Sequence, residues 1–414
     1  MVILNRPLRI AMLSYRSKPH CGGQGVYVRH LSRELDALGH HVEVFSGQPY
    51  PDLDPGPRLS RLPSLDLYQE DDPFRTPGLT EYRDWTDVLE TAMMWGGAFP
   101  EPLTFSIRAL RALRARAADF DVVHDNQGLG YGMLGVRRLG LPLVTSIHHP
   151  ISVDRRIELA AAGRLRALNL RRWYGFVRMQ ARVARRVAGP GSLITVSESS
   201  KRDICRDFNV PPDQVHIVPL GVDARVFRPR EAARVPGRII AVASADSAIK
   251  GVATLLRAVG KLATDRDVHL VVVGKPAPGT ERLAAQLSLA DRITFTHGLD
   301  EQAFSALLAS AETAVVPSLY EGFSLPAVEH MASGTPLVAS NTGALPEVTG
   351  DAAVLVTPGE DEELAAVLRR LHDSPAERAA LADRALDRVR TRFAWPAVAR
   401  ATVERYRGAM EPAC

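Results

Sequence analysis

Short apolar runs alternate with helix-period segments along almost the whole chain, and this rhythm constrains the fold more than any other feature. In the first half, a helix is expected over 26–38 and strands are expected at 8–14, 41–45, 121–124, 141–147 and 192–196. The rhythm then restarts, with strands expected at 238–243, 269–273, 293–296, 313–317, 336–339 and 353–356. Strands that alternate with helices form right-handed βαβ units and parallel sheets. The sequence therefore predicts an α/β fold with two such halves.

The length of the chain also favours two domains, because 414 residues exceed what one hydrophobic core usually supports. The seam is expected within 218–229, an irregular stretch with proline near each end, and we place the boundary after residue 222. Residues 47–104 interrupt the first half and are rich in proline, aspartate and glycine. A loop of this length is usually functional or disordered. Because its aromatic residues can pack, we favour an insertion that faces a partner or an acceptor.

Charge and cysteine content limit the classes of function. Residues 1–229 hold 31 Lys+Arg against 24 Asp+Glu, a net charge of +7, whereas the remainder is at −3. A basic first half can meet an anionic acceptor or a membrane surface. Nucleic acid is not expected, because the basic residues are not interleaved with stacking aromatics. Three scattered cysteines show no metal or disulfide spacing, which favours a reducing cytoplasm. No apolar run is long enough to span a membrane, and no signal-peptide pattern opens the chain.

The segment Glu321-Gly-Phe-Ser-Leu-Pro-Ala-Val-Glu329 carries the most specific chemistry. Pro326 can begin a helix, because its missing N–H is not needed at the first helical position. The loop of Gly322, Phe323, Ser324 and Leu325 would then direct backbone N–H groups at one spot, where a phosphate is favoured. The carboxylates at either end are suited to binding hydroxyl pairs. Phosphate-binding amides between two such carboxylates indicate a nucleotide-sugar site.

Three further positions lie where parallel strands end, which is the ligand-binding edge of open α/β sheets. Gly22-Gly23-Gln24-Gly25 opens a helix after the first strand, so it can approach an anion or simply make a tight turn. His148-His149 follows the strand over 141–147, and either a sugar contact or a structural role fits it. Lys250 follows the strand over 238–243 and can neutralise a leaving diphosphate, although most lysines are only solvated.

Two other patterns have plain structural explanations. Asp52-Leu-Asp54 mimics a metal-binding D-x-D motif, but it lies in a proline-rich loop and we interpret it as a coincidence. Residues 164–186 hold eight arginines with apolar residues near one helical face. A helix packed on its own domain is favoured there over a helix at a membrane surface.

Taken together, these motifs resemble the family-4 retaining glycosyltransferases of the GT-B fold, and the resemblance covers nearly the whole chain. It rests mainly on the segment 318–340 and is supported by Val218-Pro-Leu-Gly-Val-Asp223. The resemblance implies two Rossmann-like domains with parallel sheets that face each other across a cleft. Residues 1–222 would bind the acceptor, 223–392 would bind the nucleotide sugar, and a C-terminal helix over 393–410 would cross back to the first domain.

Roles follow from the resemblance position by position. It implies catalytic roles for Lys250 at the diphosphate, for Glu321 at the transferred sugar and for His148 at the donor sugar. Donor binding is implied for Gly23, Ser244, Gly322, Phe323, Ser324, Leu325, Glu329 and His297, with Glu329 on the ribose. Acceptor binding is predicted for Asn126 and His149, and no metal or other cofactor is expected. The family commonly places arginine where this chain has Ala245, and glycine where it has Ser324.

The implied reaction is hexosyl transfer with retention, in which the leaving phosphate oxygen takes the acceptor proton. The opening segment 13–28, the segment 63–68 of the insertion and Ser244-Ala-Asp-Ser are similar to actinobacterial mannosyltransferases that elongate methylmannose polysaccharides. That resemblance favours GDP-mannose and α-1,4 transfer to a saccharide or glycolipid acceptor. The alternatives are a UDP-glucose-dependent α-glucosyltransferase, a sugar-nucleotide epimerase and a non-catalytic nucleotide-sugar sensor. A cytoplasmic enzyme is expected, and peripheral membrane contact and a homodimer stay open.

Overall fold

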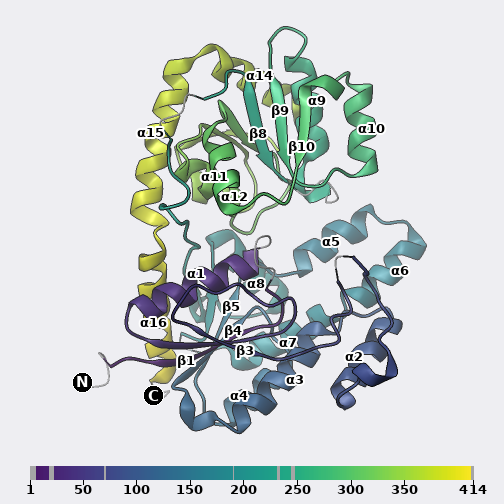
Figure 1. The fold of residues 1–414 in the computed structure, drawn as a ribbon, viewed down its shortest axis with the longest axis vertical. Coiled ribbons are helices and arrows are strands. Elements are labelled where there is room, and N and C mark those ends of the chain that lie inside the picture. The colour runs from purple at the N-terminus through teal and green to yellow at the C-terminus, as the bar shows by residue number, and fades with distance from the viewer. Residues whose placement is uncertain are drawn as a thin grey trace. The chain divides into compact units, whose positions relative to one another are not determined.

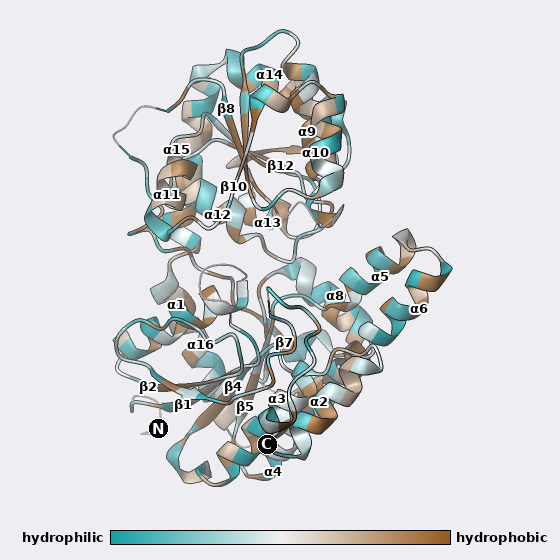
Figure 2. Ribbon diagram, turned by 45° about the vertical axis from the view of Figure 1, so that its right-hand side comes forward, coloured by the Kyte–Doolittle hydropathy of each residue, from teal (hydrophilic) through white to brown (hydrophobic). Residues whose placement is uncertain are grey.

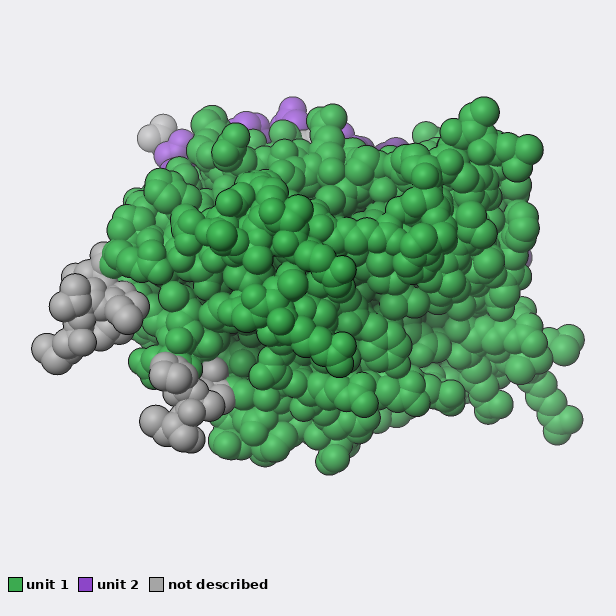
Figure 3. All heavy atoms as spheres, turned by 90° about the horizontal axis from the view of Figure 1, so that it is seen from below, with its two compact units in different colours: residues 1–196, 200–218, 398–414 green, residues 197–199, 219–397 purple. Residues whose placement is uncertain are grey.

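The computed structural model describes residues 6–17, 23–69, 71–189, 191–230, 234–243 and 248–411. Ser244 and Ala245 therefore lie outside the described residues, as does Gly22. The chain forms two compact units (Figure 3). Unit 1 comprises residues 1–196, 200–218 and 398–414, and unit 2 comprises 197–199 and 219–397.

Unit 1 is built on a seven-stranded parallel sheet in the order β3-β2-β1-β4-β5-β6-β7. Its strands are β1 (Arg9–Ser14), β2 (His41–Ser46), β3 (Arg58–Arg61), β4 (Val122–Asn126), β5 (Leu143–Ile147), β6 (Leu193–Thr195) and β7 (Val215–Ile217). The helices between them are α1 (Gly23–Ala37), α2 (Trp85–Trp95), α3 (Glu101–Arg114), α4 (Gly132–Arg138), α5 (Ser152–Ala161), α6 (Arg164–Trp173), α7 (Phe176–Val187) and α8 (Glu198–Phe208).

Unit 2 is built on a six-stranded parallel sheet in the order β10-β9-β8-β11-β12-β13. Its strands are β8 (Arg238–Val242), β9 (His269–Val273), β10 (Ile293–Thr296), β11 (Thr313–Val316), β12 (Leu337–Ser340) and β13 (Ala353–Val356). Its helices are α9 (Val252–Leu262), α10 (Pro278–Gln286), α11 (Glu301–Ala309), α12 (Leu325–Ala332), α13 (Leu345–Thr349), α14 (Asp361–Asp373) and α15 (Pro375–Arg392). The last helix, α16 (Trp395–Met410), begins in unit 2 and continues in unit 1 (Figure 1).

Each sheet is an apolar layer covered by helices (Figures 1 and 2). In unit 1, Leu13 and Val123 on the central strands pack in one core with Leu113 of α3. In unit 2, Val272 packs in one core with Leu255 of α9 and Leu368 of α14. Strands buried on both faces need nearly continuous apolar runs, and such runs are what made these strands predictable.

The strand order reverses direction once in each sheet, and these two points locate the ligand-binding edge. In unit 1 the chain runs outward from β1 to β3 and then returns to place β4 beside β1. In unit 2 the same reversal places β11 beside β8. Open α/β sheets bind ligands outside the carboxyl ends of the strands at such a switch point.

Two sequence-based interpretations need correction. The insertion over 47–104 contains β3 and α2 rather than only loop. Its Tyr68 and Phe99 pack together as expected, but Trp85 and Trp95 are exposed. The arginine-rich segment over 164–186 is two helices, α6 and α7, with a break at Tyr174-Gly175. α7 buries a face in the core of unit 1, whereas α6 buries no residue, so only α7 is the helix packed on its own domain that was expected.

Candidate functional site

Lys250 and Glu321 meet at the switch point of unit 2. Lys250 ends a short 3₁₀ turn, η5 (Ala248–Lys250), that follows β8, and Glu321 follows β11. The Lys250 Nζ atom lies 2.7 Å from Glu321 Oε1. Ser318 Oγ donates to the same oxygen, also at 2.7 Å. The family resemblance implied a role for each residue, and the structure brings the two into direct contact.

This pair leaves donors and acceptors for a ligand. An ammonium group has three N–H donors, and Lys250 uses one of them on Glu321. Within the described part of the chain, only Oε1 of Glu321 accepts side-chain hydrogen bonds, so Oε2 is available. A phosphoryl oxygen could accept from the other N–H groups of Lys250, and a sugar hydroxyl could donate to Glu321 Oε2.

The backbone around the pair depends on Gly251. Its φ is +65°, and a Cβ atom there would lie 1.9 Å from the carbonyl oxygen of Pro317 at the end of β11. The neighbouring loop is also fixed by a hydrogen bond from Leu319 N to Ile249 O at 2.7 Å. Glycine is the residue that allows this approach without a clash. Lys250 is therefore held against the β11–α12 loop by main-chain packing.

Helix α12 begins at Leu325, and Ser324 is its N-cap residue. Ser324 has φ +86° and ψ +81°, and its Oγ accepts a hydrogen bond from Ala327 N at 3.4 Å. A positive φ is a conformation that glycine adopts more readily than other residues. In the first turn, the N–H of Ala327 is bound to Ser324 Oγ and Pro326 has no N–H. The N–H of Leu325 is therefore the first-turn donor that can bind an anion. Phe323 is buried and contacts Phe393.

Glu329 lies in α12 and is partly buried. Burial raises the pKa of its carboxyl group from 4.5 to about 7, and the negative charge of Glu301 acts in the same direction. Within the described residues, its carboxylate has no hydrogen-bond partner. A carboxylate with these properties can accept bonds from the two hydroxyls of a ribose. His297 follows β10 and is exposed.

In unit 1, His148 follows β5 and is oriented by Asn126 at the end of β4. His148 Nε2 lies 2.8 Å from Asn126 Oδ1, so Nε2 carries the proton and donates. The ring also packs edge-on against Tyr27 at 4.7 Å. Burial lowers the pKa of His148 to about 3, with smaller contributions from His149 and His124, so the ring is neutral at pH 7. Its Nδ1 atom is buried without a hydrogen-bond partner in the described structure.

The remaining candidates of unit 1 are Asn126, His149 and Gly23. The Asn126 side chain is fully buried and is used by His148, so its placement fits a positioning role. His149 pairs with Asp154 at 2.9 Å. Gly23 is the first residue of α1 and is exposed. The acceptor-binding roles of Asn126 and His149 stay predictions.

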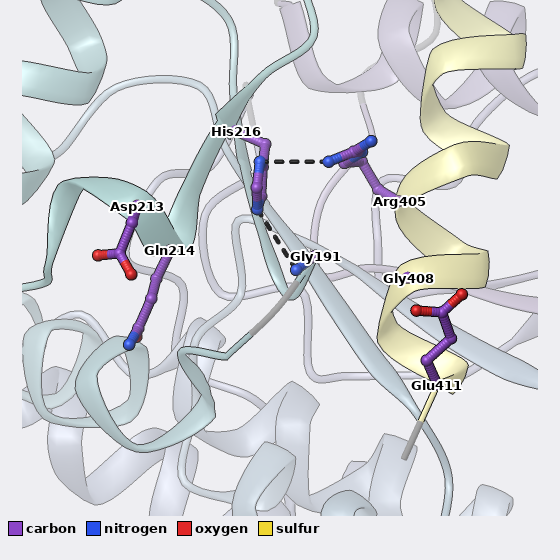
Figure 4. Close-up of a pocket in the computed structure, with 7 residues that line it drawn as sticks. All are labelled: Gly191, Asp213, Gln214, His216, Arg405, Gly408 and Glu411. Atoms are coloured by element: carbon purple, nitrogen blue, oxygen red, sulfur yellow. Dashed lines mark hydrogen bonds between the residues drawn. The ribbon is translucent and has the colours of Figure 1, made fainter. Parts of the chain in front are cut away.

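A separate pocket lies at the opposite edge of the unit 1 sheet (Figure 4). Its lining residues precede β6, precede or belong to β7, or belong to the end of the chain, namely Gly191, Asp213, Gln214, His216, Arg405, Gly408 and Glu411. Arg405 Nη1 lies 3.2 Å from His216 Nδ1, and burial together with this guanidinium lowers the pKa of His216. Because the pocket is at the amino ends of the strands, we do not assign it to the reaction.

Comparison with known proteins decides the family. Residues 21–226 match the model described as Glycosyltransferase Family 4, and residues 236–374 match the model described as Glycosyl transferases group 1. The chain is 57% identical over 409 residues to an MMP alpha-(1->4)-mannosyltransferase of Mycolicibacterium hassiacum, covering 97% of this chain and 98% of the relative. This chain is a family-4 glycosyltransferase.

More distant relatives agree with that assignment. A D-inositol 3-phosphate glycosyltransferase of Streptomyces avermitilis is 28% identical, with 99% of this chain and 89% of the relative covered. Among solved structures, a sucrose-phosphate synthase from Thermosynechococcus elongatus has a TM-score of 0.74 at 23% identity, covering 97% of this chain and 98% of that one. An Anabaena protein in complex with UDP and glucose has a TM-score of 0.68 at 16% identity, with 96% and 98% covered. These neighbours show the GT-B fold, as the sequence predicted.

The sequence analysis missed the contacts that three further residues make at the site. Ser318 shares Glu321 with Lys250, Gly251 permits their approach, and Tyr27 packs on His148. Only the Lys250-Gly251 pair left a signal, because a glycine after a lysine at a strand–helix junction indicates a tight approach. Among the described residues, no three or more His, Cys, Asp or Glu side chains form a group that could hold a metal ion.

Proposed function

We propose that this glycosyltransferase moves a mannosyl residue from GDP-mannose to a hydroxyl of a saccharide, forming an α-1,4 linkage in polysaccharide elongation. The observation that carries the proposal is the Lys250–Glu321 pair at the switch point of unit 2. A nucleotide sugar has a diphosphate next to a polyhydroxylated ring. The cation of this pair can bind the diphosphate, and the carboxylate can accept hydrogen bonds from the ring hydroxyls. The choice of mannose and of the linkage is supported by the relative that is 57% identical.

In the proposed reaction, the bond between the sugar C1 atom and the diphosphate oxygen breaks and a bond to the acceptor oxygen forms on the same face. The acceptor proton passes to the leaving phosphate oxygen. Lys250 offers its remaining N–H groups to the diphosphate as negative charge develops there, aided by the Leu325 amide. In this mechanism, the protein lowers the barrier mainly by stabilising the negative charge of the leaving group.

Two carboxylates and one imidazole complete the proposal. Glu321 Oε2 accepts a hydrogen bond from a hydroxyl of the transferred sugar, and Glu329 accepts from the ribose hydroxyls. His148 is neutral, so it can contact the sugar without repelling the positive charge that develops at C1. No metal is required, because Lys250 supplies the charge that a metal would otherwise supply.

The decisive experiment supplies GDP-mannose with an α-1,4-linked mannooligosaccharide and analyses the products. The proposal predicts release of GDP and a product with an added α-1,4-mannosyl residue, identified by NMR, and unchanged turnover with EDTA. Transfer of glucose from UDP-glucose but not of mannose would replace the proposed donor. An epimerised nucleotide sugar formed without acceptor would indicate an epimerase, and donor binding without release of nucleotide would indicate a sensor.

A further inference from the structure

Helix α2 turns its charged face inward and its apolar face outward. Asp87 and Glu90 on the inner face are each 1% exposed, and both are ion-paired with Arg108 of α3. The opposite face presents Trp85 at 59% and Trp95 at 68% exposed. An ordinary surface helix has the reverse arrangement, with apolar residues toward the core.

The exposed residues of α2 form one stripe. Trp85, Val88, Ala92 and Trp95 are spaced by three and four residues, so they share a face. Leu79, just before the helix, is also exposed. Two indoles beside aliphatic side chains are an arrangement that a water-exposed surface does not favour, and such patches usually mark a partner.

A basic surface adjoins this stripe. Just after α2, the ring of Phe99 packs against Trp173 of α6 at 5.1 Å, and a Cβ atom on Gly97 would lie 3.8 Å from Arg172 Cδ. Between Leu159 and Ser197 the chain has no aspartate or glutamate. Over that stretch, α6 and α7 present exposed arginines, namely Arg164, Arg166, Arg171, Arg172, Arg178, Arg182, Arg185 and Arg186.

Helix α6 adds apolar groups to the arginines. It buries no residue, and Leu165 is 85% exposed while Leu168 is also exposed. Together with α5 it projects from the body of unit 1 in both ribbon views (Figures 1 and 2). We call the outer face of α2 together with α6 the tryptophan–arginine surface.

We propose that the tryptophan–arginine surface docks unit 1 on an anionic lipid bilayer. Tryptophan side chains favour the headgroup region of a membrane, and clustered arginines are attracted to anionic headgroups. The two features occur together here, and the nearby carboxylates of Asp84 and Glu81 are already paired with Arg111 and Arg75. The proposal is independent of the sugar that the enzyme transfers.

Two other occupants fit the surface less well. A second copy of the chain would bring two arginine-rich faces together, and like charges repel. A polysaccharide needs hydrogen-bonding groups beside the aromatic rings, but Val88 and Ala92 between the indoles offer none. A bilayer satisfies the apolar and the cationic parts of the surface at once.

Vesicle binding followed by tryptophan fluorescence tests the proposal directly. The chain has four tryptophans. Trp395 is buried and Trp173 of α6 is partly buried, so a blue shift on binding would come chiefly from Trp85 and Trp95 of α2. Vesicles of phosphatidylcholine with phosphatidylglycerol should bind the protein and produce the shift, whereas vesicles of phosphatidylcholine alone should not. Raising the salt concentration should weaken binding.

Variants separate the two parts of the surface. We expect Trp85→Ser with Trp95→Ser to weaken vesicle binding roughly tenfold for each indole lost, and Arg171→Gln with Arg172→Gln to weaken it about fivefold for each charge. Leu38→Ser, at an exposed apolar residue in the turn after α1 of unit 1, is the matched control and should bind as the unsubstituted protein does. Both pairs of substitutions are at exposed positions, so melting temperature and turnover with a water-soluble acceptor should be unchanged.

The proposal is overturned if the protein does not bind anionic vesicles, or if binding survives loss of both indoles. Concentration-dependent dimerisation that disappears with the two tryptophan substitutions, without vesicle binding, would instead assign the surface to self-association. Retention on a mannan column that depends on the same indoles, again without vesicle binding, would assign it to a polysaccharide.

Discussion

Neutralising Glu329 should stabilise the protein above pH 7 while it weakens donor binding. The carboxyl group has a pKa raised from 4.5 to about 7, chiefly by burial. Because the folded state binds this proton more tightly than the unfolded state does, the stabilising contribution is fully present below pH 4.5 and is lost as the pH rises through 7. At 1.36 kcal/mol per unit, the loss approaches about 3 kcal/mol at pH 8.

Chemical denaturation of Glu329→Gln at two pH values measures that loss. We expect the variant to exceed the unsubstituted protein in free energy of unfolding by about 3 kcal/mol at pH 8, and by less than ~1 kcal/mol at pH 5. Glu281→Gln, at an exposed position of the same unit, is the matched control for the loss of one carboxylate. An equal difference at both pH values would refute the assignment of a raised pKa to Glu329.

Donor binding should change in the opposite direction. An ionised carboxylate only accepts hydrogen bonds, whereas an amide has one acceptor oxygen and competing donors. GDP should therefore raise the melting temperature of the unsubstituted protein more than that of Glu329→Gln, and the difference should shrink as the pH falls through 7. The same rise in both proteins would remove Glu329 from the donor site.

The remaining predictions concern the two neighbouring loops. Lys250→Ala should lower kcat by roughly 10²–10³ with circular dichroism unchanged, and near-normal turnover would exclude the lysine from the mechanism. Gly251→Ala should destabilise the protein by at least about 1 kcal/mol in urea denaturation, because its Cβ meets the Pro317 carbonyl oxygen; Gly279→Ala, with open space around it, should not. Ser324→Gly should melt higher than Ser324→Ala, because both lose the weak cap bond but only glycine relieves the positive φ; the reverse order would show that the backbone there is not strained.

The central strands of both sheets could be predicted, but two edge strands could not. The inner strand β9 was predicted with the bounds that the structure has, because buried parallel strands leave unbroken apolar runs. The two edge strands of unit 2, β10 and β13, were also predicted with matching bounds. The edge strand β3 is Arg-Leu-Ser-Arg, with a single apolar residue. Among the described strands it pairs with β2 alone, and a side-chain hydrogen bond from Ser60 to Glu43 links the two. The edge strand β7 is Val-His-Ile, and its histidine interrupts the apolar run by which the equally short β6 was recognised.

The same limit applies to the candidate site. Local pattern placed Lys250 and Glu321 each after a strand, but they are 71 residues apart in sequence. Their contact follows from the adjacency of β8 and β11, which is a property of strand order. Strand order is set by how the helices between the strands pack, and no motif encodes it. The orientation of His148 by Asn126 has the same origin, since β4 and β5 are neighbours.

The backbone around Glu321 supports a functional role without any reference to relatives. A Cβ atom on Gly343 would lie 2.3 Å from the carbonyl oxygen of Glu321, and Ala344 N donates to that oxygen at 2.9 Å. Gly251 approaches the other end of the same loop, and Ser324 has a conformation that side chains disfavour. Strained and close-packed main chain persists only where the surroundings over-determine it, and it concentrates at binding sites. Three such positions around one carboxylate imply selection for its placement, because a loop that merely joins β11 to α12 could relax all three.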